Sequence, residues 1–305
     1  MAQLQKAVTL LGAGTQGTRL AYMWSRCGRP VYLIDRNEKQ LERSWKEIQK
    51  LRSRESVSYG VTEKSGSVVR GSADELKNAV LNSWLAIECV PESLDLKRSV
   101  IQELDSLAEA QTIVASNSSS YTITEILAGL QTRTADRFIG RRRLQVMTPD
   151  FGQDVYVGGG RAHTDIAVEI MGSGETRPAI ISLLKTETRI HGFEPFHVRK
   201  SSTGYIYNRI WAAIKRETLL ALSEGVATPE EIDGCFKAVL KTPKGPCELM
   251  DTVGLDVVLD IEQHYAEIRP GLPEEPRQFL ETMIDQGKLG VKTGSGFFEY
   301  KSKSG

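Results

Sequence analysis

The stretch Val8-Thr-Leu-Leu-Gly12-Ala-Gly14-Thr-Gln-Gly17 joins an apolar run of strand length to three glycines spaced G-x-G-x-x-G. A helix-like segment follows, and a second apolar run, Val31–Ile34, ends in Asp35. Strand, glycine turn, helix and strand in this order are typical of a βαβ unit that binds a dinucleotide. The stretch therefore predicts a nucleotide-binding α/β fold, with an ordinary βαβ turn that binds nothing as the alternative.

Each glycine of the turn has a separate physical task. Gly12 permits the tight turn, Gly14 lets the backbone approach a pyrophosphate, and Gly17 lets the helix pack closely on the strand. The first helical residues, Thr15 and Gln16, offer free N–H groups at the positive end of the helix dipole. We expect these five residues to bind the phosphates of the cofactor.

Asp35 lies eighteen residues after Gly17, at the end of the second apolar run. A carboxylate there can accept hydrogen bonds from a ribose diol, and it repels a 2′-phosphate. The residue therefore favours NAD over NADP, although the neighbouring Arg36 weakens that preference.

Composition excludes several classes of protein. The 305 residues suffice for two domains with sizeable cores. Lys plus Arg number 39 and Asp plus Glu also number 39, so no overall field favours nucleic acid or an anionic membrane. No apolar run reaches the length of a bilayer, and the first strand leaves no room for a targeting peptide. The four cysteines are scattered, which is typical of reduced thiols, and no metal-binding spacing occurs. We expect a soluble, cytoplasmic protein.

The pattern predicts two domains, residues 1–200 and 201–305. In the first, strand-like runs alternate with helix-like segments such as Asn37–Ser53 and Leu94–Glu109, which predicts a Rossmann-type, doubly wound parallel sheet. Thr122-Ile-Thr-Glu125 is a capping box that predicts a helix start. The expected strands are Val8–Leu11, Val31–Ile34, Trp84–Val90, Thr112–Ala115, Arg137–Ile139 and, less regular, Val155–Val157, with a late strand within Ile190–Val198.

After Ser201 the strand signals stop. The sequence predicts helices over Tyr205–Gly225, from Thr228-Pro-Glu-Glu231 onward, over Glu248–Glu267 and over Pro276–Gln286. We therefore expect an all-helical C-terminal domain.

Together, six motifs in order resemble the L-3-hydroxyacyl-CoA dehydrogenase family, whose relatives act on hydroxybutyryl-CoA, gulonate or carnitine. The resemblance covers nearly the whole chain. It implies an NAD-binding sheet domain, a helical domain that forms a homodimer, an acyl-CoA substrate in the cleft between them, and a role in fatty acid metabolism. The motifs are the Gly12–Asp35 unit, Glu88-Cys-Val-Pro-Glu92-Ser-Leu-Asp-Leu-Lys97, Ala115-Ser-Asn-Ser-Ser119-Ser, Ser202-Thr-Gly-Tyr-Ile-Tyr-Asn208-Arg, Lys244-Gly-Pro-Cys-Glu-Leu-Met-Asp251-Thr-Val-Gly-Leu-Asp256 and Gly290-Val-Lys292-Thr-Gly-Ser-Gly-Phe-Phe.

The resemblance assigns further cofactor and substrate residues. Glu92, Lys97 and Lys292 match family positions that contact NAD. Taken alone, Glu92 and Lys97 also fit a solvated helix start, and Lys292 fits a surface lysine in a turn. Ser119 matches the serine that hydrogen-bonds the substrate and nicotinamide region, and Asn208 matches the asparagine that helps to hold the reacting groups. Without the resemblance, Ser119 would be read as part of a polar loop and Asn208 as a solvent-facing side chain.

Asn208 has one feature that does not depend on the resemblance. At 100° per residue it lies opposite the Ile206–Ile210–Ile214 stripe, so it is not a core residue of that helix face. Asp251 and Asp256 are expected to cap or brace helices rather than to catalyse a reaction.

Alcohol oxidation requires a base for the hydroxyl proton, and a histidine oriented by a carboxylate suits that task. In the family this histidine comes two residues after the glycine of an Arg-Phe-x-Gly strand, and a Val-Glu-hydrophobic triplet supplies the carboxylate. Here Arg137-Phe-Ile-Gly140 is followed by Arg141, Arg142 and Arg143, without a histidine. Val168-Glu169-Ile170 fits the triplet, so Glu169 is the predicted partner carboxylate.

His163 is the histidine nearest to the expected place, six residues before Glu169, and we take it as the provisional base. An ordinary loop histidine is the alternative. His191, His197 and His264 fit core or surface roles. Three explanations fit the atypical segment 141–165: a real insertion that brings His163 into place, an insertion that removes the base, or a sequence error such as a translated intron.

The leading hypothesis is NAD-dependent oxidation of a 3-hydroxyacyl-CoA to the 3-keto compound, with His163, Glu169, Ser119 and Asn208 as the catalytic residues. One alternative is a catalytically impaired NAD-binding family member with a regulatory or structural role. Another is a dehydrogenase of a hydroxy acid without CoA, such as gulonate.

Overall fold

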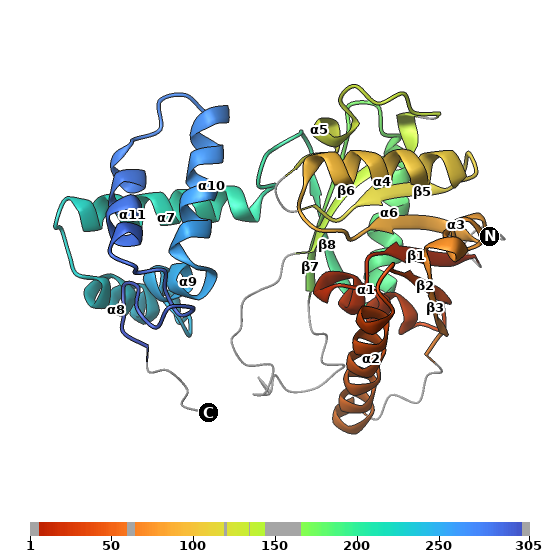
Figure 1. Cartoon of the computed structure of the whole chain (residues 1–305), viewed down its shortest axis with the longest axis horizontal. Helices are drawn as coiled ribbons and strands as arrows, with labels where there is room; N and C mark the ends of the chain where they lie inside the picture. Colours follow the sequence, from red (N-terminus) through yellow and green to blue (C-terminus); the bar gives the residue numbers. More distant parts are fainter. Residues whose placement is uncertain (1–5, 60–64, 119–120, 134, 144–165, 301–305) are drawn as a thin grey trace. The chain divides into compact units, whose positions relative to one another are not determined.

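Eight strands form a single sheet in the first unit of the chain, in the spatial order β3-β2-β1-β4-β5-β6-β7-β8 (Figure 1). Neighbouring strands run parallel except β6 and β7, which are antiparallel. The strands are β1 (Ala7–Leu11), β2 (Val31–Ile34), β3 (Val68–Gly71), β4 (Ser83–Glu88), β5 (Ile113–Ser116), β6 (Phe138–Arg143), β7 (Ile166–Gly172) and β8 (Phe193–Val198).

The computed structural model describes residues 6–59, 65–118, 121–133, 135–143 and 166–300, with the backbone alone at 54–59, 141–143 and 166. The chain divides into two units, Met1–Ile206 and Tyr207–Gly305. The sequence predicts its change from strands to helices at residue 201, and the boundary between the units follows Ile206.

Helices cover both faces of the sheet (Figure 1). One core joins the sheet to α1 (Thr15–Ser25), α2 (Glu38–Tyr59) and α6 (Pro178–Ile190). The other joins it to α3 (Leu76–Leu81), α4 (Leu94–Leu107) and α5 (Ile123–Leu127). Two short 3₁₀ helices, η2 (Ala73–Glu75) and η3 (Ala135–Arg137), complete the unit. The doubly wound fold predicted from the sequence is confirmed.

The strands differ from the prediction in a few places. β3 and β7 were not predicted as strands, and β4 ends at Glu88 rather than at Val90. The expected strand Val155–Val157 lies outside the described residues. The capping box at Thr122 is confirmed, since Glu125 N donates to Thr122 Oγ1 and the Glu125 carboxylate accepts from Thr122 N.

The second unit is all-helical in the part that the structure describes, as predicted. Its helices are α7 (Tyr207–Ser223), α8 (Pro229–Leu240), α9 (Pro246–Val253), α10 (Leu255–Ile268) and α11 (Glu275–Asp285). Thr228 caps α8 as the sequence indicates. The helix predicted over Glu248–Glu267 is two helices, because Gly254 adopts φ +104° between α9 and α10.

The isoleucine stripe does not form the core face of α7. Ile206, just before the helix, is 41% exposed and Ile210 is 56% exposed, whereas Ala212 and Leu219 are buried. The core of the unit forms around Leu219, Met250 and residues of α10 and α11. The isoleucine stripe is therefore exposed at Ile206 and Ile210 and half-buried at Ile214, so it does not lie in the core.

Candidate functional site

The glycine turn after β1 has the geometry of a dinucleotide loop. Gly12 adopts φ +113°, and a Cβ there would lie 2.6 Å from the backbone oxygen of Cys89. A Cβ at Gly17 would lie 1.9 Å from the Gly12 oxygen, so α1 packs directly on the turn. A Cβ at Gly14, by contrast, would meet nothing within 4 Å. The turn is tight on its protein side and open above Gly14, which fits the approach of a pyrophosphate.

Side chains of α1 and α2 hold the turn in place. Thr18 Oγ1 donates to the Gly14 oxygen at 2.8 Å, and Ser44 Oγ donates to the Ala13 oxygen at 2.6 Å. Gln40 Nε2 donates to the same Ala13 oxygen at 2.9 Å. Sequence reasoning missed Ser44 and Gln40, because only the fold brings the start of α2 against the turn.

Thr15 and Gln16 begin α1, directly after Gly14. Thr15 is exposed and Gln16 is half-buried. Their backbone N–H groups belong to the first helical turn, where no intrahelical acceptor exists for them. The helix end therefore supplies the donors that a phosphate requires.

Asp35 lies just beyond β2, and its carboxylate faces the turn. Ala13 N donates to Asp35 Oδ2 at 2.7 Å, and Asn37 N donates to Oδ1 at 2.8 Å. Each oxygen retains acceptor capacity, since an ionised carboxylate offers about four lone-pair sites. Asp35 is partly exposed and Arg36 is exposed. The arrangement fits the ribose of NAD, and the residues present from Gly12 to Asp35 fit this cofactor.

A second group of polar side chains lies at the carboxyl ends of β4 and β5. Lys97 Nζ lies 3.0 Å from Glu88 Oε1 and 3.2 Å from Glu92 Oε2. Ser116 Oγ donates to Glu88, and Ser118 Oγ donates to Glu92. The Lys97 side chain is 1% exposed, so the alternative of a solvated helix start is wrong for Lys97.

The ammonium of Lys97 lies between two carboxylates. Burial lowers the pKa of Lys97, but the facing carboxylates of Glu88 and Glu92 raise it by more, and the pKa is above its ordinary value. Sequence reasoning did not single out Glu88, which is 0% exposed. Its position, as a charged residue at the end of an apolar strand, could have indicated Glu88 from the sequence.

Glu169 lies in the middle of β7 and is 1% exposed. Its Oε1 accepts a 2.7 Å hydrogen bond from Ile206 N, the last backbone amide of the sheet unit. Across the antiparallel ladder, Glu169 pairs in register with Arg142, which comes two residues after Gly140. The structure thus pairs the predicted carboxylate with the position at which the family carries its histidine.

Two predicted catalytic residues, Ser119 and His163, lie outside the described residues. Two other predicted site residues belong to the helical unit. Asn208, in the first turn of α7, is half-buried. Lys292, in the final glycine-rich turn, contacts both carboxylate oxygens of Asp256. That contact lowers the pKa of Asp256, chiefly through the hydrogen bond from Lys292.

Asp251 braces the same glycine-rich turn. Its carboxylate accepts from Phe297 N and Phe298 N, both at 3.0 Å, and from Tyr300 Oη at 2.9 Å. Burial raises its pKa, and the two backbone donors oppose that shift. As expected from the sequence, both residues have structural contacts. Asp251 braces the glycine-rich turn, whereas Asp256, in the first turn of α10, accepts backbone hydrogen bonds at the start of that helix as well as the contact from Lys292.

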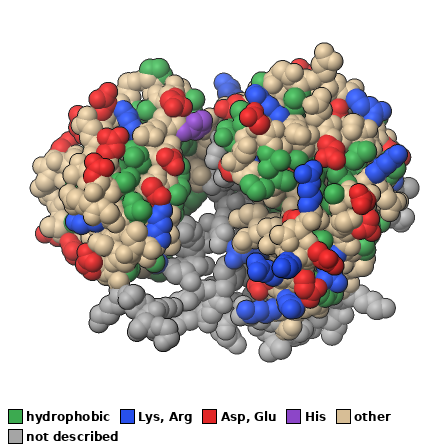
Figure 2. Space-filling model, viewed as in Figure 1, with side chains coloured by type: hydrophobic (Ala, Val, Ile, Leu, Met, Phe, Trp, Pro, Cys, Tyr) green, Lys and Arg blue, Asp and Glu red, His purple; other side chains and the backbone are tan. Residues whose placement is uncertain are grey.

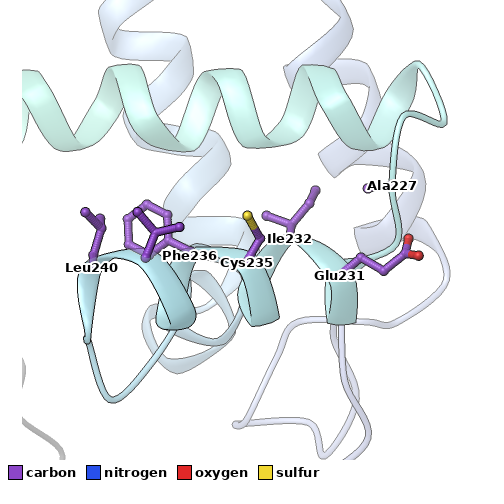
Figure 3. A pocket seen from close by; sticks show the side chains of 7 residues that line it. Ala227, Glu231, Ile232, Cys235, Phe236 and Leu240 are labelled. Atoms are coloured by element: carbon purple, nitrogen blue, oxygen red, sulfur yellow. The ribbon is translucent and has the colours of Figure 1, made fainter.

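Other features of the described residues bear on function. They contain no group of three or more His, Cys, Asp or Glu side chains arranged to hold a metal ion. Within the same part of the chain, no helix is both long and apolar enough to cross a membrane. Acidic and basic side chains both occur on each unit (Figure 2). A pocket follows α8, lined by Ala227, Glu231, Ile232, Cys235, Phe236, Val239 and Leu240 (Figure 3).

Comparisons with known proteins agree over nearly the whole chain. Residues 7–141 match the family model "3-hydroxyacyl-CoA dehydrogenase, NAD binding domain", and residues 204–300 match "3-hydroxyacyl-CoA dehydrogenase, C-terminal domain". The mitochondrial hydroxyacyl-coenzyme A dehydrogenase of Mus musculus is 32% identical, over 98% of this chain and 92% of its own length. A probable 3-hydroxybutyryl-CoA dehydrogenase of Bacillus subtilis is 28% identical, over 98% and 99%.

A solved structure extends the agreement to three dimensions. The (S)-3-hydroxybutyryl-CoA dehydrogenase PaaH1 of Ralstonia eutropha has a TM-score of 0.81 and 27% identity, over 97% of this chain and 99% of its own. Both halves of the chain and their order are therefore those of one family. With a dinucleotide loop built for NAD at its start, the chain belongs to the 3-hydroxyacyl-CoA dehydrogenase family.

Proposed function

We propose that this protein oxidises the 3-hydroxyl group of a 3-hydroxyacyl-CoA to a ketone with NAD as the hydride acceptor. The observation that carries the proposal is the glycine turn, open above Gly14 and faced by the Asp35 carboxylate, on a sheet that also buries Glu169. The relatives named above support the acyl-CoA substrate, because both are hydroxyacyl-CoA or hydroxybutyryl-CoA dehydrogenases by name.

The proposed roles divide the reaction between the residues. The hydride leaves the substrate carbon for NAD, and the hydroxyl proton passes to a base. Glu169 orients that base, and Ser119 and Asn208 position the substrate. Glu92, Lys97 and Lys292 act on the cofactor side.

The identity of the base is the open part of the proposal. Arg142 is opposite Glu169 in the strand register, and a guanidinium stays protonated, so it cannot accept the hydroxyl proton. His163 therefore remains the proposed base. If no residue serves, the protein is a catalytically impaired NAD-binding family member, and removal of a base costs orders of magnitude in rate while binding survives.

The decisive experiment follows NADH oxidation with acetoacetyl-CoA in wild type and in His163→Ala. Turnover that falls about 100-fold or more in the variant supports His163 as the base. Equal turnover in both removes His163 from the mechanism. NADH binding by fluorescence, without turnover of acetoacetyl-CoA or gulonate, supports the impaired alternative, and turnover of gulonate alone supports the non-CoA alternative.

The atypical segment 141–165 has its own test. Peptide mass spectrometry of the natively expressed protein across Arg137–Arg177 shows whether the segment is present. Its absence would trace the missing histidine to an error in the sequence, and its presence would make the insertion a property of the protein.

We also propose a homodimer formed through the helical unit. The apolar side chains along α8 support this, since Val239 is 70% exposed and Leu240 is 56% exposed beside the pocket of Figure 3. Analytical ultracentrifugation of wild type and Val239→Lys tests the proposal, and a wild-type monomer would refute it. A cytoplasmic location is proposed from the four free cysteines, and cell fractionation checks it.

A further inference from the structure

A buried charged network stands behind the glycine turn. Glu88, the last residue of β4, accepts hydrogen bonds at both oxygens. Lys97 Nζ donates to Oε1 at 3.0 Å and to Oε2 at 3.2 Å, Ser116 Oγ donates to Oε1, and Val90 N donates to Oε2 at 3.1 Å. A fully buried carboxylate with this set of donors is fixed in position by its surroundings.

Lys97 is engaged from the protein side. Its ammonium donates to Glu88, lies 3.2 Å from Glu92 Oε2 and lies 3.4 Å from the Val90 oxygen. An ammonium has three N–H donors, and these acceptors occupy them. Glu92, with 35% of its side chain exposed, is the member of the network that reaches solvent.

The network lies on the nicotinamide side of the cofactor site. Asp35, just beyond β2, faces the ribose end of the site, and β4 lies on the opposite side of β1 in the sheet. Cys89, next to Glu88, donates its N–H to the Leu11 oxygen at 2.7 Å, and a Cβ at Gly12 would lie 2.6 Å from the Cys89 oxygen. A dinucleotide that crosses the turn from Asp35 therefore extends toward the ends of β4 and β5.

The network carries a net charge. Two carboxylates and one ammonium sum to −1, and the charge is carried to the surface at Glu92. The oxidised nicotinamide ring bears a positive charge, whereas the reduced ring is neutral. We infer that Glu88 is a positioning residue that holds Lys97 and Glu92 in a network of net charge −1, which favours oxidised over reduced cofactor.

A purely structural role for Glu88 makes a different prediction. A loosened site would weaken NAD⁺ and NADH alike, because the two share every part except the charge of the ring. The ratio of the two dissociation constants therefore separates the charge effect from a loss of structure. The measurement needs cofactor binding alone, so it remains informative in a protein without turnover.

The test measures Kd for NAD⁺ and for NADH on the full chain by calorimetry. Glu88→Gln and Glu92→Gln each bring the sum of charges to zero. In both variants we expect the Kd of NAD⁺ to rise roughly tenfold relative to that of NADH, as for a unit charge acting across a partly solvated site. If Glu88→Gln does not fold, Glu92→Gln carries the test, because it leaves the buried pair intact.

Two controls make the result decisive. The double variant Glu88→Gln/Lys97→Met again sums to −1, and its ratio should return toward that of wild type. Glu103→Gln changes the same unit of charge on the exposed side of α4 and should leave the ratio unchanged. An unchanged ratio in Glu92→Gln, a shift in the opposite direction, or a double variant that stays shifted would overturn the inference.

Discussion

The cofactor side and the acid–base side of the sheet unit differ in how completely the residues expected for their function are present. On the cofactor side, the glycine turn, Asp35 and the Glu88 network are each held by hydrogen bonds from neighbouring elements. On the acid–base side, Glu169 is buried and held, yet the residue opposite it in register is Arg142. The difference predicts that binding of the cofactor and turnover of the substrate can be changed separately in this chain.

The largest expected effect is the loss of cofactor binding when the glycine turn is disrupted. In Gly17→Ala the new Cβ would lie 1.9 Å from the Gly12 oxygen, so the turn must open. We expect loss of detectable NADH binding by fluorescence and a decrease of about 3 kcal/mol in the free energy of unfolding. Gly14→Ala, with open space at its Cβ, is the matched control and should unfold as wild type does. Retained NADH binding in Gly17→Ala would contradict this account of the turn.

The second prediction concerns the acid–base side, where a substitution supplies the histidine that is missing opposite Glu169. If the protein lacks a base, Arg142→His supplies an imidazole opposite Glu169 in the strand register and should raise acetoacetyl-CoA reduction about 100-fold. If His163 is the base, the rate should stay near that of wild type. Arg141→His is the control, because adjacent strand residues point to opposite faces of the sheet. The rates of the two variants and wild type are compared at saturating NADH. Equal rates in both variants would show that the missing histidine does not explain the contrast.

The third prediction concerns Lys215, a buried lysine of the helical unit, which contrasts with Lys97 on the cofactor side. Lys215 on α7 is 3% exposed, and the nearby Glu262 is already bonded by Arg216 at 2.9 Å. Burial lowers the pKa of Lys215 to about 8, with Glu262 opposing the shift and Arg216 adding to it. Lys97, by contrast, keeps a raised pKa between its two carboxylates.

The sign of the pH dependence of Lys215 follows from linkage. Between pH 8 and the unfolded value of 10.5 the unfolded chain binds more protons, so the free energy of unfolding rises with pH across that window. At pH 7 the buried charge costs on the order of 3 kcal/mol, which Lys215→Met should recover in urea unfolding. Lys46→Met, at a side chain that is 75% exposed, is the control and should change little. Unfolding curves for Lys215→Met and wild type that coincide at pH 7 would contradict the burial of an uncompensated charge.

The smallest effect concerns cofactor choice. Asp35→Ser removes the carboxylate but keeps a hydroxyl acceptor, and we expect the affinity for NAD to fall about tenfold while that for NADP rises. The ratio of the two dissociation constants is the readout, since disturbance of the turn would weaken both. An unchanged ratio would mean that the specificity lies elsewhere in the site.

The sequence predicts much of the fold because its signals are local. The glycine turn, the Thr122 and Thr228 caps and the strand–helix alternation depend on neighbours in the chain, and each is present in the structure. Strand β3 escaped prediction because its middle residues, Val69 and Arg70, are exposed at the edge of the sheet. Gly254 splits one predicted helix because its positive φ ends the first segment.

The site was less predictable because its contacts join distant segments. Ser44 and Gln40 reach the turn from α2. Glu88, at the end of β4, contacts Lys97 in α4 and Ser116 at the end of β5. Periodicity also misled, since Ile206 and Ile210 repeat with helical spacing but are exposed, and Ile214 is half-buried. Spacing identifies a face of a helix, and only the rest of the fold determines whether that face is covered.

Because Ile206 N donates a hydrogen bond to Glu169, the amide signal of Ile206 reports on the charge of the Glu169 carboxylate. The backbone amide of the last residue of the sheet unit donates to the carboxylate that we propose orients the base. Any change in the charge of that carboxylate must alter the chemical shift and the hydrogen-exchange rate of this amide. The ionisation of Glu169 can thus be followed at a single peptide group, in a protein that turns over substrate or in one that does not.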